Sequence, residues 1–293
     1  MELHRILVAT DFSAAGHAAV ARAGQLAAQF QSQLTILHAT PDWTLFCDRA
    51  TAHASHYADI TRNAQELLRE EVTRLGREFG LTTVRGEINQ DRATVAITRA
   101  LESFQPNLLI LGAGGEHIGN TTVLGGTALK LISRVNVPLL LVRDPAPAPY
   151  SSTLAAIGDE VGLAGRLVYW AAQFGGSGVC HVVRAYEAPY ASRMRLCRYG
   201  DAEISQAAAA QRQSAQRDCE LLKDRAQAGT QLLVHIVRGA PVSVVLEQIK
   251  ECAPRLVLIG QHQHHSGEHP SAWAAGVGTR IAYHCPTDVM LVP

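Results

Sequence analysis

Two runs of the sequence decide the fold: Leu108-Leu109-Ile110-Leu111-Gly112, and its near copy Leu256-Val257-Leu258-Ile259-Gly260 located 148 residues later. A proline precedes each run at the same separation, Pro106 in the first case and Pro254 in the second. Self-similarity at one fixed spacing indicates that a structural unit has been duplicated. The chain is therefore predicted to be a tandem repeat of one domain.

The repeat extends toward the start of each copy. Asp11 and Asp159 are separated by the same 148 residues, whereas Ala27–Phe30 returns as Ala171–Phe174 at a separation of 144. The missing residues amount to about one helical turn. The first helix of the second copy is therefore expected to be about a turn shorter.

Each copy alternates short apolar runs with longer helical patterns. Because the runs are nearly continuous rather than alternating, they are typical of parallel strands buried on both faces. Single helices between such strands predict an α/β fold: two tandem, Rossmann-like, doubly wound domains with five-stranded parallel sheets. We expect domains at 1–144 and 151–293, joined by the proline-rich linker 145–150. In the first copy, the expected strands are 4–9, 33–39, 82–88, 107–112 and 137–142, and the expected helices are 14–30, 55–79, 92–104 and 124–135.

Composition excludes several classes of protein. The 293 residues carry 26 basic and 26 acidic side chains, so no positive excess favours nucleic acid or an anionic membrane. No apolar run reaches the roughly 18 residues of a spanning helix, and no signal-peptide pattern is present. The six cysteines form no C-x-x-C pair, which is typical of unpaired thiols in a reducing compartment. These features predict a cytoplasmic protein.

The glycines after the fourth expected strand form a candidate phosphate site. Gly112-Ala113-Gly114-Gly115 is followed, nine residues later, by Gly125-Gly126-Thr127 at the start of a helix. Glycines let backbone amides approach a phosphate closely, and a helix start adds unsatisfied N–H groups. The alternative interpretation is that these glycines only turn the chain.

An acid follows the first expected strand, at the same edge of the sheet. Asp11 could accept a hydrogen bond from an adenine amine or a ribose hydroxyl. It could instead be the N-cap of the helix that begins near Ala14. The two roles are compatible, since a carboxylate has several acceptor sites.

These motifs resemble the universal stress protein family over most of both copies. The resemblance is carried by Val8-Ala9-Thr10-Asp11-Phe12-Ser13, by the second strand Leu34–His38 and by the final strand Val137–Val142. It implies an adenine nucleotide alpha hydrolase-like fold. The ATP-binding branch of the family has the pattern G-x2-G-x9-G-[S/T], and this chain departs from it by one residue. Gly112, Gly115 and Gly125 match the pattern, whereas Gly126 stands where Ser or Thr is usual and Thr127 follows one place late.

The resemblance also implies a ligand and its contacts. The ligand would be ATP or AMP, with or without Mg²⁺. Asp11 and Ala39 would line the adenosine end of the site. The phosphates would lie against Gly112, Gly115, Gly125, Gly126 and Thr127.

Other nucleotide motifs are excluded. There is no G-x4-G-K-[S/T], and Lys130 is the only lysine of the first half, which excludes a P-loop NTPase. No G-x-G-x-x-G follows the first strand of either copy, which argues against a dinucleotide-binding oxidoreductase. Gly175-Gly176-Ser177-Gly178 precedes a strand and is interpreted as a helix stop.

The second copy departs further from the nucleotide pattern. Gln263 replaces the second glycine, and Ala275-Gly276 aligns with Gly125-Gly126 after a longer loop. We therefore expect no ATP site of the usual kind there. The second copy is expected to be structural or to bind a different ligand.

Histidines provide the remaining candidates. Metal binding by the loop histidines is the lesser alternative to a solvated loop, since their spacing matches no zinc pattern. His53 and His56, with Cys47, are interpreted as a polar helix face rather than a site. His38 is interpreted as a satisfied core histidine rather than a general base. The loop histidines are His262, His264, His265 and His269, with Glu268 nearby.

Three classes of function remain open. The first is a stress protein regulated by an adenine nucleotide in the first domain. The second is a nucleotide-free structural or regulatory protein acting through protein contacts. The third is a slow ATPase in which His117 and Mg²⁺ assist hydrolysis. The family resemblance further implies pairing of the final strands, Val137–Val142 and Val289–Val292, within one chain or in a homodimer.

Overall fold

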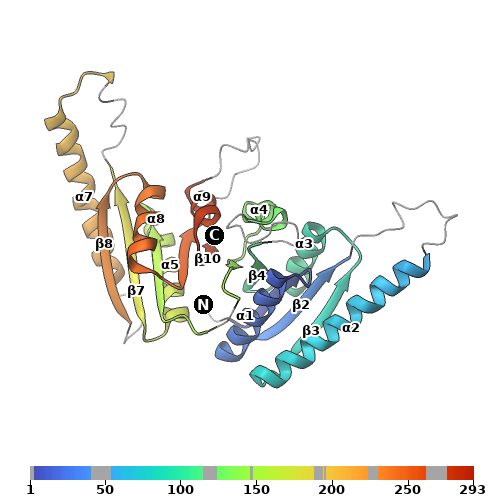
Figure 1. Ribbon diagram of the computed structural model, residues 1–293. Coiled ribbons are helices and arrows are strands. Elements are labelled where there is room, and N and C mark those ends of the chain that lie inside the picture. The colour runs from blue at the N-terminus through green and yellow to red at the C-terminus, as the bar shows by residue number, and fades with distance from the viewer. Residues whose placement is uncertain are drawn as a thin grey trace. The chain divides into compact units, whose positions relative to one another are not determined.

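The protein forms two compact units, Met1–Ala148 and Pro149–Pro293. The computed structural model is shown in Figure 1. It describes residues 3–40, 54–114, 124–145, 148–187, 194, 196–223, 230–261 and 276–293.

The first unit contains a parallel sheet in the order β3-β2-β1-β4-β5. The chain starts in the middle of the sheet with β1, adds β2 and β3 on one side, and then crosses to the other side of β1 for β4 and β5. The carboxyl ends of β1 and β4 therefore flank a topological switch point. Its elements are β1 (Arg5–Thr10), α1 (Ala14–Phe30), β2 (Gln33–Ala39), α2 (Ala54–Phe79), β3 (Val84–Asn89), α3 (Ala93–Phe104), β4 (Leu108–Gly112), α4 (Gly126–Ile132) and β5 (Leu139–Val142).

The second unit repeats this arrangement in the order β8-β7-β6-β9-β10, again all parallel. Its elements are β6 (Ser152–Ile157), α5 (Val161–Gly175), β7 (Val179–Tyr186), α7 (Asp201–Lys223), β8 (Gln231–Arg238), α8 (Pro241–Cys252), β9 (Leu256–Gly260), α9 (Val277–His284) and β10 (Asp288–Val292).

Helices cover both faces of each sheet. In the first unit α1 and α2 pack on one face and α3 on the other; in the second unit α5 and α7 lie opposite α8 (Figure 1). Most residues of the central strands β1, β4, β6 and β9 are consequently buried, and all four residues of β5 are buried. This confirms the predicted α/β fold with two doubly wound domains.

Helix lengths follow the expected pattern with one difference. Helix α5 has 15 residues against 17 in α1, so it is two residues shorter rather than a full turn. It ends at Gly175, and Gly176 adopts a positive φ of 55°, which confirms the helix stop.

The strand register aligns the two copies one residue differently from the sequence comparison. Val8 pairs with Ile110 in the first unit, and Ala155 pairs with Leu258 in the second. Because β4 and β9 are the repeated runs, Ala155 is the counterpart of Val8. The equivalence of Asp11 with Asp159 is therefore wrong: the counterpart of Asp11 is Gly158, and that of Phe12 is Asp159.

Buried polar contacts hold the two ends of the proline-rich segment. Arg22 on α1 is fully buried, and its Nη1 donates to Gln25 Oε1 and to the Ala148 carbonyl, each at 2.6 Å. In the second unit the Tyr150 hydroxyl donates to the buried Asp288 carboxylate at 2.7 Å. Each unit thus anchors its own end of the segment through a side chain whose polar group has a partner.

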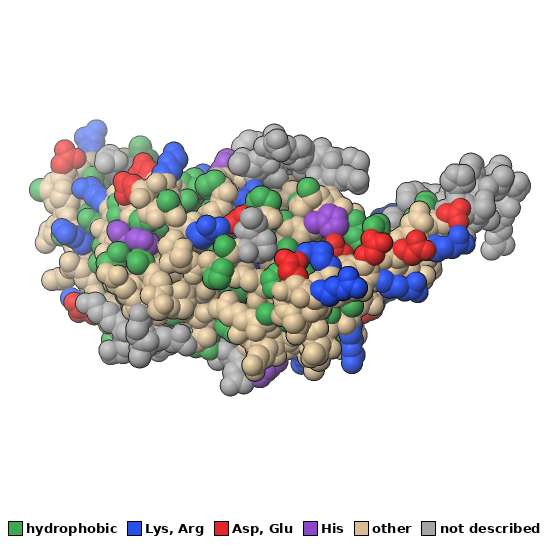
Figure 2. All heavy atoms as spheres, turned by 60° about the horizontal axis from the view of Figure 1, so that its bottom comes forward, with side chains coloured by type: hydrophobic (Ala, Val, Ile, Leu, Met, Phe, Trp, Pro, Cys, Tyr) green, Lys and Arg blue, Asp and Glu red, His purple; other side chains and the backbone are tan. Residues whose placement is uncertain are grey.

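Charges are mixed on the exposed helices. Arg74 of α2 pairs with Glu71 at 2.6 Å and with Glu78 at 2.8 Å, and Figure 2 shows basic and acidic side chains interspersed along this helix. Among the described residues, no helix is both long and apolar enough to cross a membrane.

Gly178 provides a test of the second unit's packing. A Cβ at this position would lie 2.2 Å from the Ser151 carbonyl oxygen, whereas a Cβ on Gly158 would meet nothing within 4 Å. We expect Gly178→Ala to lower the free energy of unfolding by about 2 kcal/mol and Gly158→Ala to change it by less than about 0.5 kcal/mol. Urea unfolding followed by circular dichroism measures both; equal stability of the two variants would contradict the packing.

Candidate functional site

A cleft opens in the first unit at the carboxyl ends of β1, β2 and β4, beside the start of α4. It has a volume of about 670 Å³ including its open mouth. This is the size of a small-molecule site, and it lies at the switch point where doubly wound sheets bind ligands. Its lining residues are Ala9, Thr10, Asp11, Gly16, Leu37, Ala39, Ala93, Ile97, Leu111, Gly112, Gly114, Gly125, Gly126, Thr127 and Ala128.

Most of the candidate residues come together in this cleft. Asp11 and Ala39 follow neighbouring strands, and Gly112 is the last residue of β4. Gly125, Gly126 and Thr127 approach from the start of α4. Gly115 lies outside the described residues, as do His117 and the four loop histidines of the second half.

Asp11 is exposed and does not cap α1. Ser13 is the N-cap, and its Oγ accepts a hydrogen bond from the Gly16 amide at 3.2 Å. The N-cap interpretation of Asp11 is therefore wrong. Asp11 Oδ1 instead accepts from the Ser13 hydroxyl at 2.5 Å and from the Ser13 amide at 3.0 Å. These bonds orient the carboxylate, while Oδ2 receives no hydrogen bond from the described residues.

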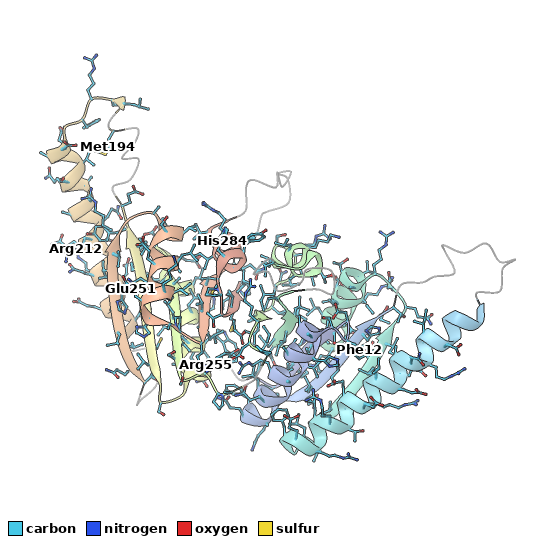
Figure 3. All side chains as sticks on the ribbon, in the orientation of Figure 1. Phe12, Met194, Arg212, Glu251, Arg255 and His284 are labelled. Carbon is cyan, nitrogen blue, oxygen red and sulfur yellow. The ribbon has the colours of Figure 1, made fainter. Side chains whose placement is uncertain are left out.

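Phe12 and His38 do not line the cleft but are the chain neighbours of two residues that do, Asp11 and Ala39. Phe12 adopts a positive φ of 60°, and its ring centroid lies 4.4 Å from that of His38 (Phe12 is labelled in Figure 3). His38 Nδ1 donates to the Thr10 carbonyl at 2.8 Å, because a carbonyl can only accept. This fits a satisfied structural histidine.

Gly112 and Gly126, on the β4 side and the α4 side of the cleft, have very different surroundings. A Cβ on Gly112 would lie 2.6 Å from the Ala15 carbonyl oxygen, so only glycine lets β4 end this close to α1. A Cβ on Gly126 would meet nothing within 4 Å. None of the described residues therefore fills the space beside Gly126 at the start of α4.

The second unit has a cleft at the corresponding strand ends, of about 1050 Å³ with its mouth. Arg184 of β7 projects into it and is 7% exposed. Arg184 is the counterpart of His38 by strand register. Its guanidinium donates Nη1 to the Ala185 carbonyl at 3.0 Å and Nη2 to Asp159.

The surroundings of α9 also differ from those of α4. Gly276 is the N-cap of α9, as Gly125 is of α4. The alignment of Ala275-Gly276 with Gly125-Gly126 is therefore wrong by one residue, and Val277 and Gly278 take the places of Gly126 and Thr127. A Cβ on Gly278 would lie 2.5 Å from the Gly260 carbonyl oxygen. In the second unit the end of β9 therefore lies so close to α9 that only glycine fits at position 278. In the first unit the same place holds Thr127, which has a side chain.

Comparison with known proteins identifies the family. The model of the universal stress protein family matches residues 2–143 and again residues 153–293. The chain belongs to the universal stress protein family. Two matches in one chain also confirm the tandem duplication.

Solved structures agree with the tandem fold. A universal stress protein from Archaeoglobus fulgidus is 15% identical, with a TM-score of 0.67, and the match covers 100% of this chain and 99% of that one. A structure described as a universal stress protein from Pseudomonas aeruginosa is 18% identical, with a TM-score of 0.62, covering 99% and 93% of the two chains. A search of curated proteins finds no match.

Arg184 is a site residue that sequence reasoning missed. It stands inside an apolar strand, and its position in the second cleft depends on a register that the sequence comparison placed one residue away. The sequence did carry one signal for this site: an arginine near the carboxyl end of an otherwise mostly apolar strand.

The Arg184–Asp159 ion pair is testable. Asp159→Ala would leave a nearly buried guanidinium without its carboxylate, and we expect a loss of about 1 kcal/mol in unfolding free energy, kept small because the Asp159 side chain is 88% exposed. Adding Arg184→Leu should recover stability, since the uncompensated charge is removed. Thermal unfolding of the wild type, both single variants and the double variant measures the coupling. Additive effects would contradict the interaction.

Proposed function

We propose that this universal stress protein binds an adenine nucleotide, ATP or AMP, in the first unit as a regulatory ligand. The observation that carries the proposal is the convergence of Asp11, Ala39, Gly112, Gly125, Gly126 and Thr127 on one cleft. These are the described residues that the family resemblance assigns to the nucleotide.

The lining chemistry supports a base at one end and phosphates at the other. Leu37, Ile97 and Leu111 present apolar surface suited to an adenine ring. Asp11 Oδ2, which no described residue hydrogen-bonds, is an acceptor for a ribose hydroxyl or the adenine amine. Gly126 and Thr127 offer backbone amides at the start of α4, and a Cβ on Gly126 would meet none of the described atoms within 4 Å. Donors of this kind are suited to phosphate oxygens.

The charge of the cleft bears on the form of nucleotide. None of its described lining residues is Lys or Arg. A triphosphate placed there would depend on backbone dipoles, the Thr127 hydroxyl and a bound Mg²⁺ for compensation of its charge. Mg²⁺ would be held mainly by phosphate oxygens and water, as is usual for this ion.

The second unit is proposed not to share this ligand. Arg184 and Asp159 stand at the places of His38 and Phe12, and a Cβ on Gly278 would lie 2.5 Å from the Gly260 carbonyl oxygen. Pairing of the final strands and homodimer formation stay predictions, as does a cytoplasmic location.

Asp11 and Asp159 form a matched pair for testing the nucleotide site. Isothermal titration of the nucleotide-free chain with Mg²⁺-ATP, AMP and cAMP should give one site per chain. Asp11→Ala should weaken binding about tenfold, since a charge-assisted hydrogen bond is lost, and Asp159→Ala should leave it unchanged. Two sites, or equal effects of both substitutions, would contradict a site in the first unit alone. No binding at millimolar nucleotide would favour the nucleotide-free protein instead.

Gly126→Ser tests the departure from the family pattern. The open space at Gly126 accommodates the added side chain, and the hydroxyl would be a further donor beside the phosphates. We expect affinity for Mg²⁺-ATP to rise about threefold to tenfold. Gly114→Ala, which also meets nothing within 4 Å, is the control for a small added side chain. Weaker ATP binding by the serine variant would place the phosphates elsewhere.

A further inference from the structure

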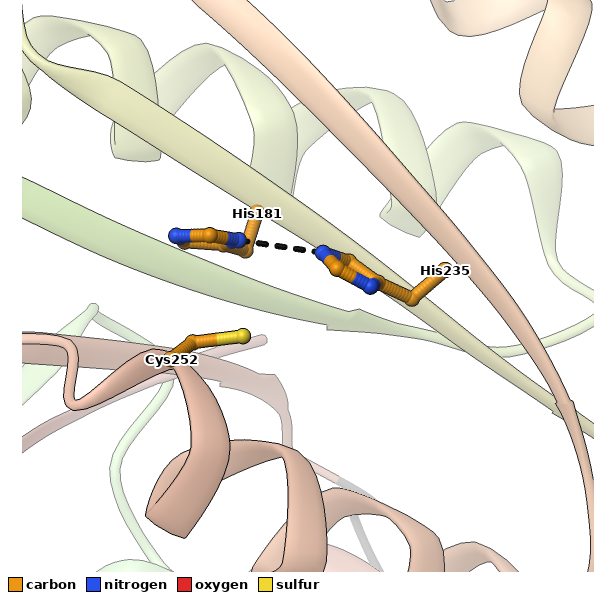
Figure 4. Close-up of side chains that lie close together, drawn as sticks. All are labelled: His181, His235 and Cys252. Atoms are coloured by element: carbon orange, nitrogen blue, oxygen red, sulfur yellow. Dashed lines mark hydrogen bonds between the residues drawn. The ribbon is translucent and has the colours of Figure 1, made fainter.

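Two histidines and a cysteine meet on one face of the second unit's sheet. His181 lies on β7, His235 on β8 and Cys252 at the end of α8 (Figure 4). The register pairs Val183 with His235, so His181 and His235 are diagonal neighbours whose side chains share a face. Helix α8 packs on β7 and brings the cysteine over the same face.

The polar atoms of these side chains converge. His181 Nδ1 and His235 Nε2 are 3.0 Å apart, and one ligand atom from each of the three residues lies within 4.8 Å of the others. In Figure 4 the Cys252 sulfur points toward the two imidazole rings. All three residues are half-buried, so a small ion can reach them from solvent without leaving them fully hydrated.

The first unit has no such group at the equivalent positions. Strand register and helix ends align His181 with Thr35, His235 with Glu87 and Cys252 with Phe104. Phe104 instead packs against Arg5, whose Cζ lies over the phenyl ring at 5.8 Å from the ring centroid. The fold itself therefore does not require a histidine pair and a thiol here.

Two imidazoles and a thiolate are ligands that Zn²⁺ prefers. In a tetrahedral zinc site, nitrogen and sulfur ligands are about 3.3–3.7 Å apart. The observed separations, 3.0 Å between the nitrogens and no more than 4.8 Å overall, reach that geometry through small side-chain rotations. We propose that His181, His235 and Cys252 form a zinc site, with water or an exogenous ligand in the fourth position.

The protonation states are compatible with this role. Burial, with a smaller contribution from His235, lowers the pKa of His181, which keeps that ring neutral near pH 7. Metal binding requires both facing nitrogens to be unprotonated, so each neutral ring carries its single proton on the far nitrogen. The Cys252 thiol loses its proton to solvent as the zinc–sulfur bond forms.

A carboxylate beside the cluster favours a cation. Glu251 adjoins Cys252 on α8 and is labelled in Figure 3. Burial, and then the negative charge of Glu251, raise the pKa of the Cys252 thiol, so the free thiol stays protonated. The same negative charge attracts Zn²⁺, which in turn stabilises the thiolate. The site is independent of the nucleotide proposal, since no residue of the first unit contributes to it.

Co²⁺ serves as the spectroscopic probe for zinc. The full-length, metal-free, reduced protein is titrated with Co²⁺ and then with Zn²⁺. We expect one equivalent of Co²⁺ to give tetrahedral visible bands and a thiolate charge-transfer band, both removed by Zn²⁺. Cys252→Ser should abolish the charge-transfer band, and His235→Gln should lower Co²⁺ affinity by at least about 100-fold.

Two matched controls separate this site from other ligands in the chain. Cys197→Ser removes an exposed cysteine and should leave the spectrum unchanged. A variant with His262, His264, His265 and His269 all replaced by Asn should also retain it. A charge-transfer band that survives Cys252→Ser, or that is lost with the four loop histidines, would overturn the proposal.

A measurement on the unsubstituted chain tests the site without relying on variants, which could fail to fold. One equivalent of Zn²⁺ should slow alkylation of Cys252 by iodoacetamide about tenfold or more, as read by mass spectrometry, because the metal holds the sulfur lone pair. Alkylation of Cys197 in the same sample should not change. Equal rates at Cys252 with and without Zn²⁺ would overturn the site.

Discussion

Burial of parallel strands on both faces is the constraint on which the rest of the structure depends. The central strands pair their backbone groups with their neighbours and point mainly apolar side chains at the helices above and below, so these faces are poorly suited to binding a polar ligand. Ligands can enter only where strands end or where an edge strand is incompletely covered. The cleft of the first unit is of the first kind: β4 ends at Gly112, where any side chain would collide with Ala15 of α1.

The two units share this architecture but differ in the side chains at the carboxyl ends of their strands. In the first unit, the Asp11 carboxylate is held by Ser13, and no described atom lies within 4 Å of where a Cβ on Gly126 would be. In the second unit, a nearly buried Arg184 is compensated within the protein by Asp159. A guanidinium that is already neutralised has less to gain from a phosphate, since binding the anion would require breaking an existing ion pair. The same fold therefore does not imply the same ligand.

The sequence was sufficient to predict the duplication, the element order and most of the residues of the candidate cleft. These features depend on apolar periodicity and on glycines at places where a side chain would not fit. It was insufficient wherever a single residue of register matters. The matching spacing of Asp11 and Asp159 suggested equivalence, but the strands place Gly158 opposite Asp11. The N-cap role considered as one alternative for Asp11 likewise belongs to Ser13, because Asp and Ser are both good N-cap residues and only the geometry distinguishes them.

The histidine–cysteine cluster escaped prediction for a different reason. His181, His235 and Cys252 are far apart in sequence with no recognisable metal spacing, and they meet only because β7, β8 and α8 pack together. The position of β8 at the edge of its sheet is what makes the cluster chemically useful. A central strand would enclose two imidazoles completely and bar an ion from entering, whereas a fully exposed edge would leave them solvated. A half-covered edge strand gives partial desolvation together with access, which are the conditions under which neutral imidazoles and a thiol can exchange a hydrogen bond for a metal.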